Sequence, residues 1–546
     1  MSNKIIYATD TKIGNVAAET DDEFLFECFL SHPALSEISD ISNTKLFILG
    51  STGAGKTALL RMLEKDKKAT FLELEELSMS YISNSDTISF LRKIDVDITI
   101  FLQSLWRHVI CIELIKQIIQ KQNSNEQQFI YKLKNLFRNS DQENELVKYV
   151  ERYQGNFWNT TDAIISEYTK SIESEIEAEF QAEIHKASAR AGYARSLGEE
   201  KKIQFQERAK KFVDHKLLSE LHKIQKTLSE YLSNQKDCYF ILIDKIDEYW
   251  IDPTLKNIII HSLFEACKAI HKIRNLKVVV ALRNDVYEKM NLEFAHSQAQ
   301  IEKNEDFIVR LKWTKEQLAQ LVGKRINLLF RRKYTKDNVH FDDIFKSNYG
   351  TKHRTWIYMI ERTLYRPRDI IKFVNFCFQV AEGKSEISKK DFKNAEKLYS
   401  EDRHEALASE WRQVYPATKV LIEHLSNYKA YFEISDFNPD KLVSDLTGRS
   451  DIQDIQNDPI WRRLDEITTK HSDDRSDHSI LPKDIFQRLH LIGAVGLKIG
   501  SEEAWNWIHE TQRPLRQETI TDETKVKIHP MLEKAIIRDH SKNMKS

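Results

Sequence analysis

The chain has 546 residues, of which 41% are hydrophobic and 30% are charged, and its formal net charge at pH 7 is −1. A chain of this length is expected to fold into about two to four domains, and its near-neutral balance argues against attraction of the whole molecule to nucleic acid or membranes. The five cysteines are scattered and form no CxxC pair, which argues against a disulfide framework or a thiolate zinc site.

The start of the chain, MSNKIIYATD, has no charged segment followed by an apolar run, so no secretory signal is predicted. No apolar run approaches the roughly 18 residues that a membrane-spanning helix needs. We therefore expect a cytoplasmic protein that makes no membrane contact.

The first motif lies in KLFILGSTGAGKTALLRML, which begins at Lys45. Glycine is scarce, with 14 in the chain, yet three lie in this segment, which fits the pattern GxxxxGK[ST] between an apolar strand and a helix-forming run. Such glycines let successive backbone amides converge on a phosphate at the start of the helix. Lys56 would contact the β- and γ-phosphates, and the Thr57 hydroxyl would ligate Mg²⁺. The expected nucleotide-binding residues are Gly50, Ser51, Thr52, Gly53, Ala54, Gly55, Lys56, Thr57 and Ala58.

A later apolar strand, YFILID at 239–244, ends in acids. Because the C-terminal ends of parallel strands face the ligand crevice, Asp244 is expected to hold Mg²⁺ through water as the Walker-B acid. Many ATPases place the water-polarising acid directly after this aspartate, where this chain has Lys245. Either Asp247 or Glu248 could polarise the water instead, hydrolysis could be slow, or these two acids only favour the start of the next helix.

Three further strands are predicted, at 69–77, 276–287 and 306–313. The second carries Arg283 and Asp285 at its end, and Arg283 could touch the γ-phosphate or the attacking water, or simply close the strand at the surface. Helical segments separate the strands, which is typical of a doubly wound sheet. We therefore predict an α/β fold with a parallel P-loop NTPase sheet.

In the order of these parts the chain resembles a family of bacterial P-loop ATPases related to the KAP and STAND NTPases, in the AAA-like branch. The segments that carry the resemblance are GNVAAETDDEFLFECF (14–29), LGSTGAGKTALL, YISNS (81–85), LWRHV (105–109), ILIDKIDEYW, ALRNDVYEKM and YRPRDIIKF (365–373). The resemblance implies ATP binding, a nucleotide-gated conformational role and a link to bacterial defence or mobile elements. KAP-type strand ends carry two adjacent acids, and Lys245 departs from that pattern, so brisk turnover is not expected.

Residues 88–235 are expected to form a long helical insertion. Residues 162–185 carry seven acids and one base, whereas residues 186–226 carry eleven bases and five acids. This complementarity predicts a helical hairpin at 162–232. The hairpin could project as an arm for a partner or for self-association, could be a solvated structural element, or could contact nucleic-acid phosphates through its basic arm.

The chain becomes largely helical after Trp313, and residues 313–402 are expected to form a helical lid. Arg366 and Arg368 flank Pro367 at the start of an amphipathic run. By analogy with AAA-like lids, one of these arginines could reach the γ-phosphate. The alternative is that Pro367 sets the first turn of a helix and the arginines pair with surface acids.

The last part of the chain contains ILPKDIFQRLHLIGAVGLKIG, in which a helical pattern is followed by a glycine-punctuated strand. This order predicts a winged-helix-like domain, which would bind DNA or proteins. The expected domains are an N-terminal segment packing near the nucleotide (1–40), the ATPase core (41–312), the lid (313–402) and the winged-helix-like domain (403–546).

The leading hypothesis is an ATPase that binds ATP and Mg²⁺, hydrolyses ATP slowly and acts as a switch for partner engagement or assembly. The resemblance implies a bacterial setting for such a switch, in antiphage defence or in regulation. Two alternatives stay open: a DNA-binding ATPase that uses the winged-helix-like domain and the basic arm, and a nucleotide-stabilised scaffold without turnover. The expected catalytic residues are Lys56, Asp244, Asp247, Glu248 and Arg283, with Arg366 and Arg368 as further nucleotide contacts and Thr57 and Asp244 on the metal.

Overall fold

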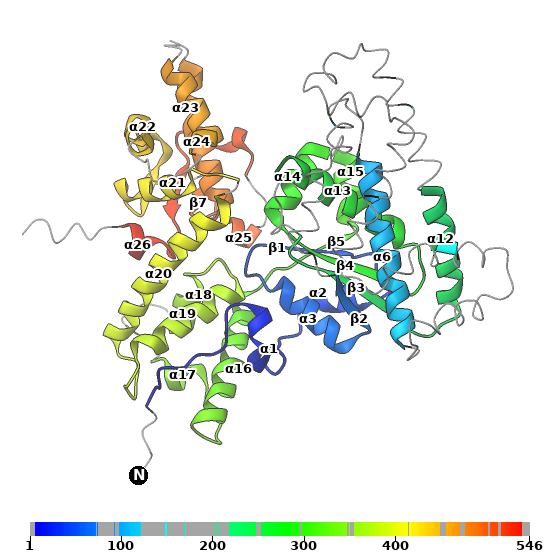
Figure 1. Cartoon of the computed structure of the whole chain (residues 1–546). Helices are drawn as coiled ribbons and strands as arrows, with labels where there is room; N and C mark the ends of the chain where they lie inside the picture. Colours follow the sequence, from blue (N-terminus) through cyan, green and yellow to red (C-terminus); the bar gives the residue numbers. More distant parts are fainter. Residues whose placement is uncertain are drawn as a thin grey trace, which may run out of the picture. The chain divides into compact units, whose positions relative to one another are not determined.

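The computed structural model divides the chain into two compact units (Figure 1). The sheet unit comprises Ser31–Ser51 and Lys56–Leu311, and the helical unit comprises Met1–Leu30, Thr52–Gly55 and Lys312–Ser546. The structure describes residues 6–72, 74, 92, 98–121, 148–149, 170, 203, 207, 218–246, 253–294, 298–346, 349, 354–412, 414–447, 455–469, 475–500, 503–511 and 515–537.

A five-stranded parallel sheet forms the centre of the sheet unit. Its strands are β1 (Phe47–Gly50), β2 (Ala69–Leu72), β3 (Tyr239–Ile243), β4 (Leu276–Arg283) and β5 (Ile308–Arg310), in the order β2-β3-β4-β1-β5. Every residue of β1 and β3 is buried, as expected for parallel strands whose two faces are both covered by helices. The predicted parallel α/β sheet is confirmed, and β4 lies between β1, which leads into the GxxxxGK[ST] motif, and β3, which precedes Asp244.

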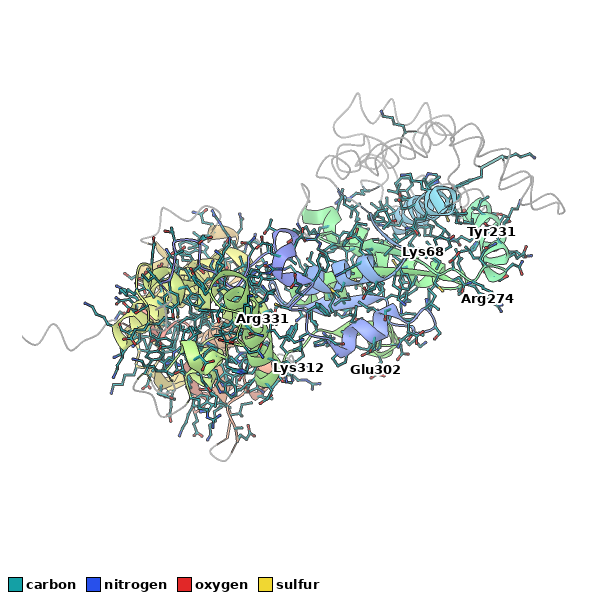
Figure 2. All side chains as sticks on the ribbon, turned by 90° about the horizontal axis from the view of Figure 1, so that it is seen from below. Lys68, Tyr231, Arg274, Glu302, Lys312 and Arg331 are labelled. Atoms are coloured by element: carbon teal, nitrogen blue, oxygen red, sulfur yellow. The ribbon has the colours of Figure 1, made fainter. Side chains whose placement is uncertain are left out.

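Helices surround this sheet, and side chains fill the space between the helices and the strands (Figure 2). Along the chain these helices are α2 (Pro33–Ser39), α3 (Lys56–Asp66), α6 (Thr99–Lys121), α12 (Leu218–Ser233), α13 (Pro253–Ile270), α14 (Asn284–Phe294) and α15 (Gln298–Glu305). The longest, α6, packs along α13, and its buried Trp106 donates an indole hydrogen bond to the Ile259 carbonyl at 3.2 Å. Phe264 of α13 stacks on Phe47 with ring centroids 4.0 Å apart, which joins these helices to the sheet.

A buried lysine fixes the turn between α2 and β1. Lys277, at the start of β4, is fully buried, and its Nζ donates to the carbonyls of Glu37, Asp40 and Asn43 at 3.1, 2.6 and 3.0 Å. Carbonyls at the end of a helix have no partner within that helix, and an ammonium group has three protons to donate. One side chain therefore satisfies three carbonyls of the turn.

Several predicted features lie outside the described residues. These are the YISNS segment at 81–85, Asp247, Glu248 and most of the hairpin predicted at 162–232. Within the predicted insertion, the structure describes α6 and α12 as helices. The hairpin itself stays a prediction.

The segment Lys312–Ser546 of the helical unit starts with five helices. They are α16 (Lys315–Lys333), α17 (Phe341–Ile344), α18 (Thr355–Ile360), α19 (Pro367–Val380) and α20 (Lys389–Trp411). α16 starts at a capping box in which the Thr314 side chain accepts from the Gln317 amide and the Gln317 side chain accepts from the Thr314 amide. Pro367 is the first residue of α19, the position where proline costs no hydrogen bond. α19 packs on α20, with Phe373 stacked on Tyr399 at 4.5 Å.

The N-terminal residues pack within the same unit. They include the short helix α1 (Asp22–Leu25). Arg325 of α16 is buried and donates to the Ile13 carbonyl at 3.0 Å and to the Asp21 carboxylate at 2.6 Å. The predicted position of residues 1–40 near a nucleotide stays a prediction.

The C-terminal part of the helical unit combines helices with a small antiparallel sheet. Its elements are α21 (Thr418–His424), β6 (Tyr431–Glu433), α22 (Pro439–Thr447), α23 (Pro459–Thr469), α24 (Arg475–Leu491), β7 (Val495–Lys498), α25 (Ile508–Thr511), β8 (Lys525–Ile528) and α26 (Glu533–Ile536). The sheet has the order β6-β8-β7. α24 leads directly into β7, so the structure contains the helix and glycine-containing strand that the sequence predicts here. The domain division predicted at 402–403 falls inside α20 and stays a prediction.

Candidate functional site

The GxxxxGK[ST] motif joins the end of β1 to the start of α3. Within the sheet unit, the Nζ of Lys56 donates to the carbonyls of Gly50 and Ser51 at 2.9 and 3.1 Å. The lysine is therefore folded over the loop that its own motif forms. α3 begins at Lys56, so the amides of its first turn lack intrahelical partners and can donate to an anion.

The structure brings Thr57 and Asp244 together. The Thr57 hydroxyl donates to Asp244 Oδ2 at 2.6 Å, although the two residues are 187 positions apart. Asp244 Oδ1 accepts from the amide of Lys245 at 2.9 Å, and Lys245 has a positive φ of 57°. The backbone of Lys245 thus turns sharply after β3, and its amide donates to one carboxylate oxygen of Asp244. The Thr57 hydroxyl donates to the other.

The tip of the loop, Thr52–Gly55, makes its contacts in the helical unit. Gly53 and Gly55 have φ values of +79° and +99°, which residues with side chains rarely adopt. A Cβ on Gly53 would lie only 2.8 Å from the Cβ of Arg368, and the Arg368 amide donates to the Gly53 carbonyl at 3.3 Å. The Nε of Arg368 is buried and has no hydrogen-bond partner among the described residues. This arginine therefore lies directly against the loop.

The sequence did not single out Trp313 as a site residue. This buried indole donates to the Ala54 carbonyl at 2.7 Å. Trp313 follows β5 by three residues, and the C-terminal ends of parallel strands meet at one edge of a sheet. Its place at the end of the strand predicted at 306–313 was the signal that could have identified it.

The other predicted arginines already have acidic partners. Arg283 makes two hydrogen bonds to the Asp285 carboxylate, at 3.0 and 2.8 Å. Arg366 is buried and donates to both oxygens of Glu410 at 3.3 and 3.0 Å. Burial opposes the charge of Arg366, but Glu410 and then Asp369 outweigh that burial and raise its pKa above the usual value. Of the two arginines that flank Pro367, Arg368 is the one whose contact with the GxxxxGK[ST] motif is seen among the described residues.

The residues present fit a nucleotide with magnesium. The Thr57 hydroxyl and the Asp244 carboxylate are hard oxygen ligands of the kind Mg²⁺ prefers. The Oγ1 atom of Thr57 lies 2.6 Å from Oδ2 of Asp244. Glycines occupy the loop positions whose φ values demand them. Asp247 and Glu248, the proposed water-polarising acids, lie outside the described residues.

The described residues contain neither a disulfide bond nor a cluster of metal ligands of the zinc-site kind. All five cysteines are free thiols, and no group of three or more His, Cys, Asp or Glu side chains in the described ranges is placed to hold a metal ion. The described helices also include none that combines the length and apolar character needed to span a membrane.

Comparisons with known proteins match one part of the chain to a family model. Residues 316–408 match the model of the FunZ-associated C-terminal helical domain, a stretch that covers α16 to α19 and most of α20. No curated protein matches the chain. Among solved structures, the chain is similar to the ORC2 protein of Aeropyrum pernix, solved as ADPNP–ADP complexes, with a TM-score of 0.36 and 10% identity over 92% of this chain and 87% of that one. A TM-score this low does not show a shared fold, and the predicted kinship with KAP and STAND NTPases stays a prediction. Residues 316–408 are therefore similar to the FunZ-associated C-terminal helical domain.

Proposed function

We propose that the chain is a P-loop ATPase that binds ATP with Mg²⁺, hydrolyses it slowly and acts as a nucleotide-dependent switch. The observation that carries this proposal is the 2.6 Å hydrogen bond between Thr57 and Asp244. It joins the hydroxyl of the GxxxxGK[ST] motif to the acid at the tip of β3, the pair of oxygen ligands that such enzymes use for magnesium.

Each residue of the motif has a distinct part in this proposal. Lys56 would exchange the carbonyls of Gly50 and Ser51 for β- and γ-phosphate oxygens, and the amides at the start of α3 would donate to the same phosphates. Thr57 and Asp244 would hold Mg²⁺, which neutralises charge that develops on the phosphates.

Slow turnover follows from the residue after Asp244. Lys245 occupies the position where many ATPases carry the acid that orients water, and its amide is already bonded to Asp244. A cation there cannot accept a proton from the attacking water. Asp247 and Glu248 remain our candidates for that role.

The switch would act through Arg368. This residue is the second of α19 and packs on Gly53, so a change in the loop on loss of the γ-phosphate would reach a helix of the family-matched domain. Arg366 would serve as a fixed point, because its buried ion pair with Glu410 holds the start of α19 on α20. We propose that the shift of α19 controls engagement of a partner or self-assembly, and antiphage defence is the setting that the sequence resemblance suggests.

A test of the metal site compares wild type with Asp244→Asn. We expect the variant to bind ATP with the same affinity with and without Mg²⁺, whereas magnesium should strengthen binding by wild type roughly tenfold or more, because the carboxylate charge is lost. Calorimetric titration with ATP, in Mg²⁺ and in EDTA, measures both affinities. Asp237→Asn is the control, because Asp237 lies before the other end of β3 and pairs with Lys68. Retention of the magnesium effect in Asp244→Asn would contradict the assignment.

A second candidate function, DNA binding, is favoured by the C-terminal part of the helical unit. Its helix, strand, helices and two strands, with β6 paired to β8 and β8 to β7, support our proposal of a winged-helix-like domain. Lys498 and Lys525 lie directly opposite each other in the β7–β8 ladder. Like charges in this position repel, and a bound phosphate backbone would relieve that repulsion.

The double variant Lys498→Gln/Lys525→Gln tests this second function. We expect weaker binding to duplex DNA and a slope of log affinity against log salt that is shallower by about two, because roughly one counterion is released per lysine–phosphate contact. Fluorescence anisotropy of a labelled duplex at several salt concentrations measures both. Lys389→Gln/Lys390→Gln on the exposed start of α20 is the matched control. An unchanged salt slope in the first variant would exclude these strands as the contact.

A further inference from the structure

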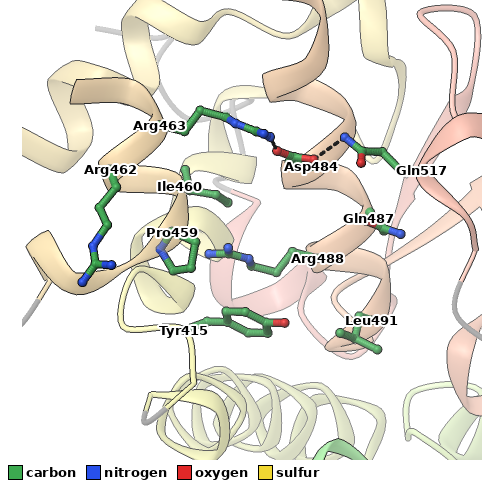
Figure 3. Close-up of a pocket in the computed structure, with 10 residues that line it drawn as sticks. All are labelled: Tyr415, Pro459, Ile460, Arg462, Arg463, Asp484, Gln487, Arg488, Leu491 and Gln517. Atoms are coloured by element: carbon green, nitrogen blue, oxygen red, sulfur yellow. Dashed lines mark hydrogen bonds and ion pairs between the residues drawn. The ribbon is translucent and has the colours of Figure 1, made fainter. Parts of the chain in front are cut away.

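The helical unit contains a cavity of about 620 Å³ that no predicted site residue lines (Figure 3). Its walls come from the start of α23, from α24 and from two residues distant in sequence, Tyr415 and Gln517. This volume lies in the range of small-molecule sites. Three arginines, Arg462, Arg463 and Arg488, line it, so its chemistry favours an anion.

Arg488 forms the fixed part of this cavity. It is 9% exposed, and its guanidinium lies over the ring of Tyr415, 4.1 Å from the centroid. Its Nη1 donates to Asp458 Oδ1 at 2.5 Å. Asp458 is itself fully buried and accepts from the amides of Ile460 and Ala417 at 2.8 and 2.9 Å. The arginine is therefore held in one orientation before any ligand arrives.

The guanidinium of Arg488 also has N–H groups that can donate to a ligand. Its Nε and Nη2 make no hydrogen bond with any described residue, and neither is sealed from solvent. A planar guanidinium presents parallel N–H groups that match two oxygens of a phosphate. An arginine that is fixed by stacking loses little side-chain entropy when it binds.

The remaining charges leave the cavity positive. Arg463 forms an ion pair with Asp484, which also accepts from the side chain of Gln517 (Figure 3). Arg462 is exposed and has no acidic partner among the described residues. Three arginines face two carboxylates, Asp458 and Asp484, so the local formal charge is 3 − 2 = +1. The uncompensated charge belongs to Arg462.

We propose that this cavity binds a small phosphate-bearing ligand of about mononucleotide size. The phosphate would take two hydrogen bonds from Arg488 and the charge of Arg462. Pro459, Ile460 and Leu491 supply apolar wall for the rest of the molecule. The site is independent of the GxxxxGK[ST] motif, so it would let a second phosphorylated molecule act on the helical unit.

The test uses the full chain carrying Lys56→Ala, so that the phosphate-binding motif does not contribute. Calorimetric titrations with AMP, ribose 5-phosphate and inorganic phosphate should give measurable binding of the first two and weaker binding of the third. Arg462→Gln should weaken AMP binding about tenfold, the loss expected for one charged hydrogen bond. Arg488→Lys should weaken it further, because lysine keeps the charge beside Asp458 but cannot offer two parallel donors.

The control is Arg331→Gln, an exposed arginine of α16 that does not line the cavity. It should bind AMP as the parent does. Arg462→Gln changes only an exposed side chain, so its thermal unfolding should match the parent and a loss of binding would report the site itself. The proposal fails if none of the three probes binds at millimolar concentration, or if Arg462→Gln and Arg488→Lys bind AMP like the control. It also fails if only a DNA duplex binds in a way that depends on these arginines.

Discussion

Replacing Lys56 with alanine is expected to weaken ATP binding at least about a hundredfold and to abolish phosphate release. The ammonium is held over the loop by the carbonyls of Gly50 and Ser51, so it is placed to meet phosphate oxygens with little rearrangement. The variant loses those charge-assisted hydrogen bonds while the loop glycines keep their conformation. Calorimetric titration with ATP and Mg²⁺ measures the affinity, and a phosphate-release assay measures turnover.

The control for this variant is Lys65→Ala, which removes an exposed lysine near the other end of α3. It should bind and hydrolyse ATP like wild type. Equal ATP affinity of wild type and Lys56→Ala would contradict the assignment of the motif. If wild type binds ATP with Mg²⁺ and releases no phosphate, the scaffold without turnover replaces the switch.

Acid is expected to destabilise the helical unit between about pH 6.5 and pH 4. Burial lowers the pKa of His490 to about 4. Burial, followed by the charges of Arg366 and Lys315, lowers the pKa of His509 to about 3. His529 lies 5.1 Å from His509 between ring centroids, and burial followed by this neighbour lowers its pKa well below the usual value.

The direction of this pH dependence follows from whether the folded or the unfolded chain binds more protons. Above about pH 7.5, a pH unit above the usual histidine pKa, all three imidazoles are neutral in the folded and unfolded chains, so they do not make stability depend on pH. Below the usual pKa of about 6.5 the unfolded chain binds protons that the folded unit does not, and each histidine then lowers the free energy of unfolding by about 1.4 kcal/mol per pH unit. The loss through His490 is complete below its folded pKa of about 4. Thermal unfolding followed by circular dichroism at a series of pH values measures the slope.

A single substitution checks the origin of this acid sensitivity. His509→Phe keeps a ring beside Tyr365 and Trp507 and removes one buried titrating group, so its stability should fall less steeply with pH than that of wild type. His340→Gln removes an exposed histidine and should leave the slope unchanged. Equal slopes in all three proteins would show that the buried histidine does not set the acid response.

The sheet and its nucleotide motifs were predictable because they depend on local patterns. Short apolar runs mark strands covered on both faces, and the GxxxxGK[ST] spacing predicts a phosphate loop wherever a strand precedes it and a helix follows. The meeting of Thr57 with Asp244 then follows from parallel strand ends sharing one edge. These inferences need no knowledge of the rest of the chain.

The parts that the sequence left open depend on distant partners. Arg366 and Arg368 look equivalent beside Pro367, and only the position of Glu410 on another helix shows that Arg366 is paired. β6 has three residues, two of them exposed, which is too short a pattern to identify as a strand. The arginine-lined cavity likewise gathers residues from α23 and α24, whose separation in sequence hides their proximity.

The buried ammonium of Lys277 has a consequence for how the protein is made. The carbonyl of Glu37 that it caps lies 240 positions earlier in the chain. The residues of the turn therefore leave the ribosome long before Lys277, which donates to their carbonyls, has been synthesised. During that interval the carbonyls of Glu37, Asp40 and Asn43 accept hydrogen bonds from water. They pair with Lys277 only after β4 has been synthesised and has joined the sheet.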